Sequence, residues 1–271
     1  MTGAKSHETV TKFVESFATP TRRTGKIARW ENGVCPVTVG LKPTFTKFIS
    51  QRIRDVAAQV GAPVDADVAC KPNIEIVFTT TPQGLMDNVR AKQSGYLGYH
   101  DNSHQADDLA KITRPIQAWY TTVTRDLHGR PMFDSASLQG VGGQSSIEND
   151  SSLLAFGASA ITGSRLGDGR RSGLYHVIIV AEPAKLLDHE IGALADYITL
   201  LALTQISSLD TCQQLSSVVN MLASGCAPKV NALTSTDLAY LRGLYRMGPG
   251  RALRAQEDEV AYQMEQKGPG R

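Results

Sequence analysis

The stretch from Leu186 to Leu203 limits the possible folds of this chain more than any other segment. It reads LLDHEIGALADYITLLAL, and its apolar residues would leave little polar surface on a helix. A helix that is apolar nearly all round is buried in the core of a protein. The sequence therefore predicts one long buried helix over residues 184–205, which the remainder of the chain has to cover.

Segments rich in β-branched and aromatic residues precede this helix and predict strands. These predicted strands are residues 34–40, 73–80, 114–126 and 173–182. The last is apolar on both faces, which favours a central strand. Helical spacing predicts further helices at 45–60, 82–94 and 251–266. Asp210 and Gln213 resemble the N-cap pair of a short helix that ends before Gly225, and Thr234 and Asp237 resemble a capping box at the start of another helix. This order predicts an α+β fold: a mixed β-sheet flanked by the early helix and the long buried helix, with a helical C-terminal part.

Composition divides the chain into three parts. Residues 1–25 are polar with only scattered Phe and Val, and we interpret them as a flexible N-terminal arm. Residues 26–250 contain the predicted strands and helices of a single domain, and residues 251–271 form a C-terminal helix and tail. Within the domain we expect residues 95–108 to be a polar loop, and the Gly- and Ser-rich residues 134–172 to be surface loops with short strands.

The overall composition is that of an ordinary globular protein. Of 271 residues, 41% are hydrophobic and 20% charged, which is enough for a substantial core. The 28 basic and 26 acidic residues nearly balance, so the charge does not indicate a nucleic-acid or membrane-surface partner. No apolar run reaches ~18 residues, so we expect no transmembrane helix. The N-terminus lacks the apolar region of a signal peptide, although it could belong to a mature chain.

The four cysteines form two pairs that are local in the sequence. They are Cys35 and Cys70, and Cys212 and Cys226, with no C-x-x-C motif among them. This pattern favours disulfides within each pair and an oxidising compartment, against four free thiols in the cytosol. A straight helix between the second pair would separate the two Cα atoms by ~20 Å, whereas a disulfide needs less than ~7 Å. Any helix between them must therefore be short, near residues 216–223.

His189 and Glu190 begin a segment that nearly spells His-Glu-x-x-His, the zinc-binding motif of zincin metalloproteases. The motif would make His189 a metal ligand and Glu190 the general base, but Ala193 stands at the second ligand position. Asp196 shares a helix face with His189 but lies ~10 Å along the axis, whereas ligands of one zinc are ~3–4 Å apart. We therefore expect His189, Glu190 and Asp196 to form a buried, hydrogen-bonded polar cluster.

Several segments carry a family resemblance. The order of elements, together with the segment DLAYLRGLY at 237–245, resembles the zincin domain, especially the metzincin group. The segments NIEIVFTT, RPIQAWYTTVTRD, ADYITLLALTQ and DLAYLRGLY resemble an uncharacterised family of exported alphaproteobacterial proteins. The first resemblance implies a degenerate metalloprotease domain. The second implies a periplasmic or secreted location and no established activity.

Three further groups of residues are candidate sites. His100 and His104, four residues apart, could bind a metal on a helix, but in a polar loop they would be solvated. His176 lies in the last predicted strand, where a histidine is more often a hydrogen-bonded core residue than a ligand. A loop carries Arg165, Arg170 and Arg171 and could bind an anion through guanidinium forks, or it could be an ordinary solvated loop.

These observations leave competing functional hypotheses. The leading one is an exported pseudo-metalloprotease without cofactor or catalytic activity, which binds a partner protein or a cell-envelope component. The first alternative is a zinc-dependent peptidase with a rearranged metal site, which would draw on His100, His104, His176 and His189, with Glu190 as the base. The second alternative is a purely structural domain of the cell envelope.

Overall fold

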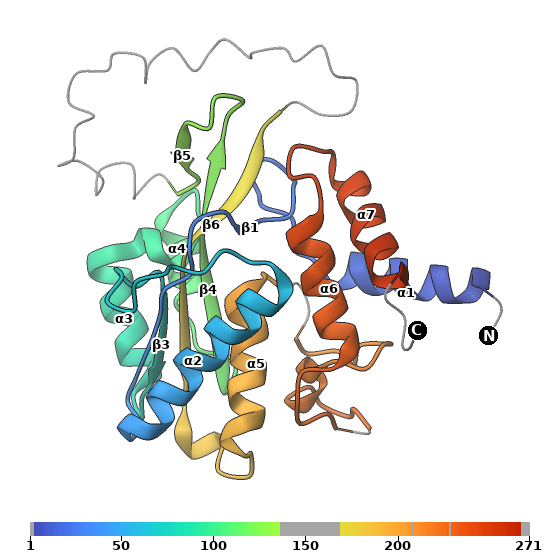
Figure 1. The fold of residues 1–271 in the computed structure, drawn as a ribbon. Coiled ribbons are helices and arrows are strands. Elements are labelled where there is room, and N and C mark those ends of the chain that lie inside the picture. The colour runs from blue at the N-terminus through green and yellow to red at the C-terminus, as the bar shows by residue number, and fades with distance from the viewer. Residues whose placement is uncertain (1–2, 136–168, 207–208, 228, 267–271) are drawn as a thin grey trace, which may run out of the picture.

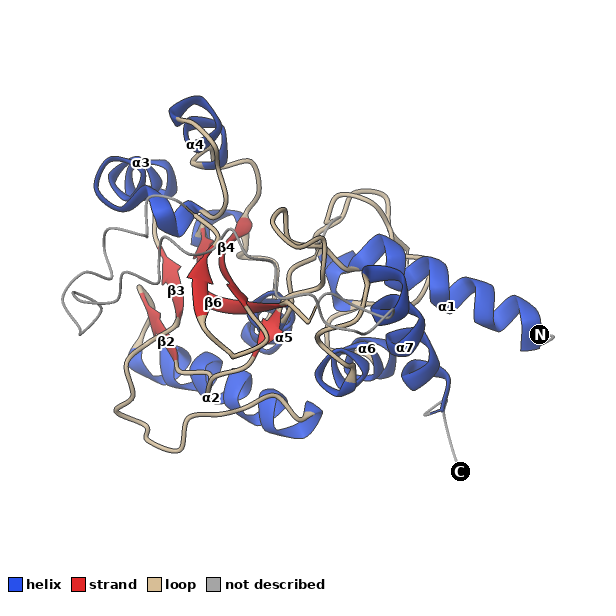
Figure 2. Ribbon diagram, turned by 90° about the horizontal axis from the view of Figure 1, so that it is seen from above, coloured by secondary structure: helices blue, strands red, loops and turns tan. Residues whose placement is uncertain are grey.

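The computed structural model describes residues 3–135, 169–206, 209–227 and 229–266. In these residues a mixed β-sheet lies between two layers of helices, and a group of helices stands beside it (Figures 1 and 2). The prediction of an α+β fold with a mixed sheet is therefore confirmed.

The sheet is built around its longest strand. Its order is β2 (Pro36–Val39), β3 (Ile74–Phe78), β6 (Arg171–Ala181), β4 (Ile116–Arg125) and β5 (Pro131–Phe133), and β1 (Arg29–Trp30) also pairs with β6. Strands β1 and β3 are parallel to β6, and β2 is parallel to β3. Strand β4 is antiparallel to β6, and β5 is antiparallel to β4. The prediction that the last strand is central is thus confirmed.

Helices cover both faces of the sheet (Figure 2). One face carries α2 (Pro43–Val60) and α5 (Ile191–Leu203), and the other carries α3 (Pro82–Gln93) and α4 (Ser103–Leu109). The helices α1 (Gly3–Phe17), α6 (Ser235–Arg246) and α7 (Leu253–Gln266) stand to the side of α5. Short 3₁₀ turns occur at Ser94–Leu97, Pro183–Lys185 and Val218–Met221. None of the described helices combines the length and apolar character needed to cross a membrane.

Successive side chains of β6 point to opposite faces of the sheet, and this explains the two layers of helices. Val177 and Ile179 point into the large core, which includes α2, α5 and the C-terminal helices. Ile178 and Val180 point into a smaller core with residues of α3 and α4. Successive side chains of a strand face opposite sides of a sheet, so a strand that is apolar at every position requires cover on both.

The N-terminal segment differs from the prediction of a flexible arm over residues 1–25. Residues 3–17 form α1, and Phe13, Val14 and Phe17 are buried in the large core. The rings of Phe13 and Phe17 contact Tyr240 of α6, with centroid distances of 6.2 and 4.8 Å. The reason is that these apolar residues are spaced three and four apart and form one face of a helix. The segment is polar on average, so its composition alone does not indicate this face.

The long helix begins later than predicted. Residues 183–185 form a 3₁₀ turn, and α5 starts only at Ile191. Glu190 has extended backbone angles, φ −67° and ψ 146°, and occupies the N-cap position. Leu187, which extends the apolar pattern in the sequence, is 82% exposed. His189 and Glu190 therefore precede the helix instead of lying on its first turn.

Two further segments differ from prediction. Residues 95–108 were expected to form a polar loop, but they include part of a 3₁₀ turn and most of α4. The Asn102 side chain caps α4 by accepting a hydrogen bond from the Gln105 N–H at 2.9 Å. The N-cap pair predicted at Asp210 and Gln213 is also wrong, because the helical turn between the cysteines starts after Ser217, whose side chain caps it.

The predicted cysteine pairing is confirmed. Cys35 is bonded to Cys70 and Cys212 to Cys226, with Cα–Cα distances of 6.1 and 5.4 Å. The Cys212–Cys226 disulfide can form because the helical element between these cysteines is only the short turn Val218–Met221, as the sequence predicted. The first disulfide closes a loop that contains β2 and α2.

The predicted capping box at the start of α6 is also confirmed. The Thr234 hydroxyl accepts a hydrogen bond from the Asp237 N–H, and the Asp237 carboxylate accepts one from the Thr234 N–H. Asp237 is fully buried, and its carboxylate also accepts hydrogen bonds from the Ser217 hydroxyl (2.5 Å) and the Val218 N–H (2.9 Å). This one carboxylate therefore joins α6 to the turn enclosed by the second disulfide.

Removing either disulfide should destabilise the protein, and the first should matter more. The bonded cysteines are 35 and 14 residues apart, so the entropy of loop closure predicts losses of about 4 and 3 kcal/mol. Urea unfolding of C35S/C70S and C212S/C226S would measure them. Equal losses, or a larger loss for the second pair, would contradict this order.

Replacing Asp237 should cost about 3 kcal/mol of unfolding free energy. In Asp237→Asn, an amide with only one acceptor oxygen faces donors from Ser217, Val218 and Thr234, of which Ser217 and Val218 are fully buried. Urea denaturation provides the measurement, and Asp258→Asn on the exposed side of α7 is the matched control, with a change within ±0.5 kcal/mol. A loss no larger than that of the control would show that the network contributes little.

Candidate functional site

A groove lies between α2 and the first turns of α5. Its volume is about 410 Å³, and we refer to it as the α2–α5 groove. Its lining comprises Phe48, Gln51, Arg52, Asp55, Glu190, Gly192, Ala193, Asp196, Asn231 and Ala232. The two helices follow the carboxyl ends of β2 and β6. In sheets with parallel strands, ligands commonly bind beyond the carboxyl ends of those strands.

Two residues that line this groove, Arg52 and Asp196, form an ion pair. The Arg52 Nε donates to Asp196 Oδ1 at 2.6 Å, and the backbone N–H of Leu233 donates to Asp196 Oδ2 at 2.9 Å. The Asp196 side chain is only 8% exposed, whereas that of Arg52 is 37% exposed. Both carboxylate oxygens are thus engaged, and the pair joins α2, α5 and the segment that leads into α6.

The predicted buried cluster of His189, Glu190 and Asp196 is not formed. Only Asp196 is buried; His189 is half-buried and Glu190 is exposed at the rim of the groove. The physical reason is that His189 and Glu190 precede α5, so the helix does not stack them above Asp196. The motif positions His189 and Ala193 likewise do not share two successive turns of one helix, which zinc binding by His-Glu-x-x-His requires. The residues of this segment do not fit a zinc ion.

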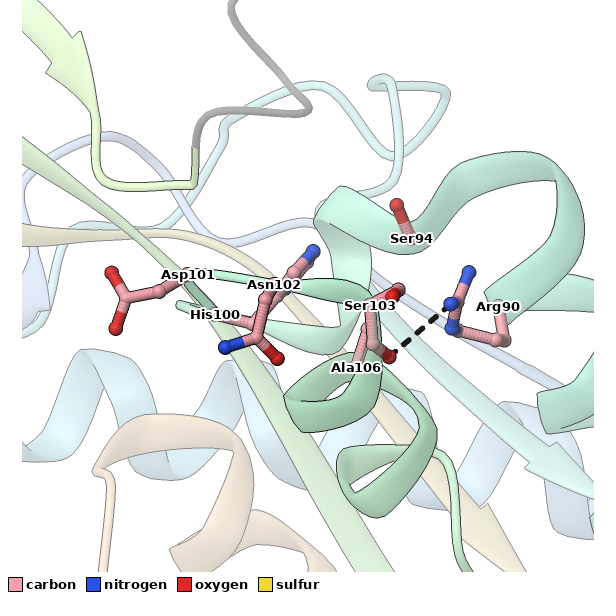
Figure 3. Close-up of a pocket in the computed structure, with 7 residues that line it drawn as sticks. All are labelled: Arg90, Ser94, His100, Asp101, Asn102, Ser103 and Ala106. Carbon is pink, nitrogen blue, oxygen red and sulfur yellow. Dashed lines mark hydrogen bonds between the residues drawn. The ribbon is translucent and has the colours of Figure 1, made fainter.

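Of the two histidines at 100 and 104, His100 lies beside a second cavity of about 290 Å³ (Figure 3), and His104 is not part of its lining. His100 lines it and its Nδ1 lies 2.9 Å from the Gly98 carbonyl oxygen, while the Asp101 side chain points away from the other labelled residues. His104 is on α4, its side chain 87% exposed and 3.8 Å from Asp108. His100 comes before this helix, so the spacing of four does not place both imidazoles on one helix face.

His176 lies on β6 beneath the 3₁₀ turn that follows α3. Its Nε2 is 3.2 Å from Glu75 Oε1 on β3, and its ring meets that of Tyr96 edge to face at 4.7 Å. The hydrogen bond with His176 holds the pKa of the Glu75 carboxyl below its usual range. Among the described residues, the buried Nδ1 atom has no hydrogen-bond partner.

The candidate metal ligands do not converge. His100, His104, His176 and His189 come from different elements, and no three His, Cys, Asp or Glu side chains within the described ranges are grouped so that they could hold a metal ion. Glu190, the proposed base, lies at the α2–α5 groove, whereas His176 bonds to Glu75 on the sheet.

The structure brings together arginines that the sequence did not connect. A third cavity, of about 570 Å³, is lined by Arg29, Glu31, Arg125 and Arg171, and we call it the arginine pocket. Of the loop residues proposed to bind an anion, only Arg171 lines it. The backbone oxygen of Arg170 accepts from Lys26 Nζ at 2.5 Å, and Arg165 lies outside the described residues. The neighbours of Arg171 come from β1 and β4, far away in the sequence.

Breaking the ion pair in the α2–α5 groove should destabilise the fold. Asp196→Ala leaves the Leu233 N–H and the Arg52 guanidinium without their acceptor, which we expect to lower the unfolding free energy by about 3 kcal/mol. A double-mutant cycle with Arg52→Met should give a coupling of about 1 kcal/mol, since Arg52 is partly exposed to water. A coupling energy of zero would show that the pair does not join the two helices.

Known proteins give no indication of the family to which this chain belongs. A comparison of the chain with known protein families, with curated proteins and with solved structures finds no match. The resemblance to zincins and to an exported alphaproteobacterial family therefore stays a prediction.

Proposed function

We propose that this chain is a non-catalytic, exported binding protein, and that its α2–α5 groove receives part of a partner protein. One observation carries the proposal: the residues that would act in a metalloprotease are used differently. His189 and Glu190 precede α5, and the exposed Glu190 stands at its N-cap position without a side-chain hydrogen bond to the helix. Asp196, the nearest acidic residue on α5, has both oxygens engaged by Arg52 and Leu233.

The disulfides support an exported location. Two disulfides link all four cysteines of the chain. Disulfides form and persist in oxidising environments such as the periplasm or the extracellular space, and they are rare in the cytosol. Together with the composition, they favour a protein that works outside the cytoplasm.

The charge and the exposed apolar surface of the groove indicate its partner. Arg52 is neutralised by Asp196, which leaves the carboxylates of Asp55 and Glu190 as the excess charge of the lining. Phe48 is 45% exposed, and Phe45, one turn before it, is 39% exposed. Aromatic residues at the surface are typical anchors of protein interfaces. The groove therefore suits a segment that places a lysine or arginine next to an apolar side chain.

Metal analysis separates this proposal from a rearranged peptidase. Protein purified without chelators should contain no stoichiometric, tightly bound zinc, and Glu190→Gln should leave thermal stability unchanged because Glu190 is exposed. One zinc per chain, or a peptidase activity that both a chelator and Glu190→Gln abolish, would overturn it.

Peptide selection tests the groove itself. Peptides selected on the intact protein from a random phage-displayed library should be enriched in a basic residue beside an apolar one. Phe48→Ser and Glu190→Gln should each weaken a selected peptide about tenfold, equivalent to ~1.4 kcal/mol. Val68→Ser is the matched control, because Val68 is 85% exposed and does not line the groove. Selected peptides without a charge preference, or with equal affinity for all variants, would contradict a role for the groove.

A further inference from the structure

The arginine pocket holds more positive charge than its protein neighbours balance. Three arginines, Arg29, Arg125 and Arg171, line it together with a single carboxylate, that of Glu31. Glu259 also acts on Arg29, but it accepts from the Gly248 N–H and pairs with Arg251. The described lining therefore carries an excess of two positive charges.

Strand register places two of these arginines directly opposite each other. Arg125 at the end of β4 is the register partner of Arg171 at the start of β6. Like charges opposite each other across a strand pair are destabilising. Glu31 offsets this by bridging them: its Oε2 lies 2.9 Å from Arg125 Nε and its Oε1 2.9 Å from Arg171 Nε. One carboxylate thus holds two guanidinium groups side by side.

Gly173 of β6 lies next to the carboxylate of this bridge. A Cβ atom on Gly173 would come within 3.7 Å of Glu31 Oε2 and within 3.3 Å of a methyl group of Val123. Gly173 is also the register partner of Arg29 on β1. A side chain here would therefore be tight against Val123 and in ordinary contact with the Glu31 carboxylate.

The guanidinium of Arg29 is fixed at the end of α6. Its Nη1 donates to the carbonyl oxygens of Leu244, Tyr245 and Met247 at 3.1, 3.0 and 2.8 Å. Burial lowers the pKa of Arg29, and the charge of Glu31 opposes this shift. Because Nη1 makes all three of these contacts, Arg29 is held rigidly next to the other two arginines.

The pairing within the pocket is incomplete. Although Arg171 Nε is 2.9 Å from Glu31, the contact is poorly aligned, and within the described part of the chain this buried N–H has no acceptor. A buried donor without a partner costs about 1–3 kcal/mol. Glu31 therefore does not satisfy every N–H group of the two arginines that it bridges.

We propose that the arginine pocket binds a doubly charged oxyanion, namely phosphate or a phosphate monoester group. An excess of two positive charges matches the −1.5 to −2 charge of a phosphate monoester at neutral pH. Guanidinium groups fit phosphate because their planar fork of N–H donors meets two oxygens at once. The pocket is separate from the α2–α5 groove, and the inference does not depend on the function proposed for that groove.

Calorimetry and thermal unfolding of the full chain test the site. Inorganic phosphate and glycerol 1-phosphate should each bind, and a concentration a hundredfold above Kd should raise Tm by about 5 °C. Dimethyl phosphate, with a single charge, should bind at least tenfold more weakly. Absence of any shift with phosphate and with glycerol 1-phosphate would overturn the proposal.

Variants establish whether the arginines are responsible. Arg171→Gln should lose binding at least tenfold, and Arg171→Lys, which keeps the charge but not the fork, should lie between it and the native protein. Arg114→Gln is the matched control, because Arg114 pairs with Asp210 and is not part of the pocket. Circular dichroism without ligand verifies that each variant is folded. Equal binding by Arg171→Gln and the native protein would overturn the assignment.

A vesicle experiment distinguishes the sources of the phosphate group. Phosphatidylcholine vesicles containing phosphatidate present the same monoester on a membrane. Binding to them that Arg171→Gln weakens supports the site with a lipid headgroup as its ligand. Binding of soluble glycerol 1-phosphate without vesicle binding supports the site with a soluble ligand.

Discussion

The backbone pairing of β6 is the constraint to which the other elements conform. Residues Arg171–Ala181 pair with β1 and β3 along one edge and with β4 along the other, and the strand is apolar on both faces. Parallel neighbours require crossover connections, which are usually helical, and two apolar faces require two layers of cover. The helices α2 and α5 on one face and α3 and α4 on the other follow from this requirement (Figure 2).

Local patterns in the sequence were sufficient for much of this fold. The apolar run in β6, the stripe of α2 and the capping box of Thr234 and Asp237 each depend on residues that are close together in the chain. The start of α5 was predicted wrongly because the apolar pattern begins before the helix does. Leu187 continues the apolar pattern of α5, yet the extended backbone of Glu190 starts the helix after it. The capping side chain of Asn102 was the available signal for α4.

The candidate sites were harder to predict because their residues meet only through the tertiary fold. The motif at His189 was visible in the sequence, but its meaning depends on where α5 begins. Arg125 and Arg171 are 46 residues apart and become neighbours through the register of β4 and β6. No spacing rule connects them with Glu31. The sequence therefore grouped Arg171 with Arg165 and Arg170, whereas the fold places it beside Glu31, Arg29 and Arg125.

The two candidate sites differ in charge and in their position along β6. The arginine pocket lies at the first residues of this strand, and the α2–α5 groove lies beside the helix that follows its last residues. Both cavities also reach α2, because Asp55 lines the groove and Gly61, six residues later, lines the arginine pocket. Six residues of an α-helix span ~9 Å, which is close to the Debye length of ~8 Å in physiological salt. Electrostatic coupling between an anion in the pocket and a basic peptide in the groove would therefore act across α2, and it would weaken as the salt concentration rises.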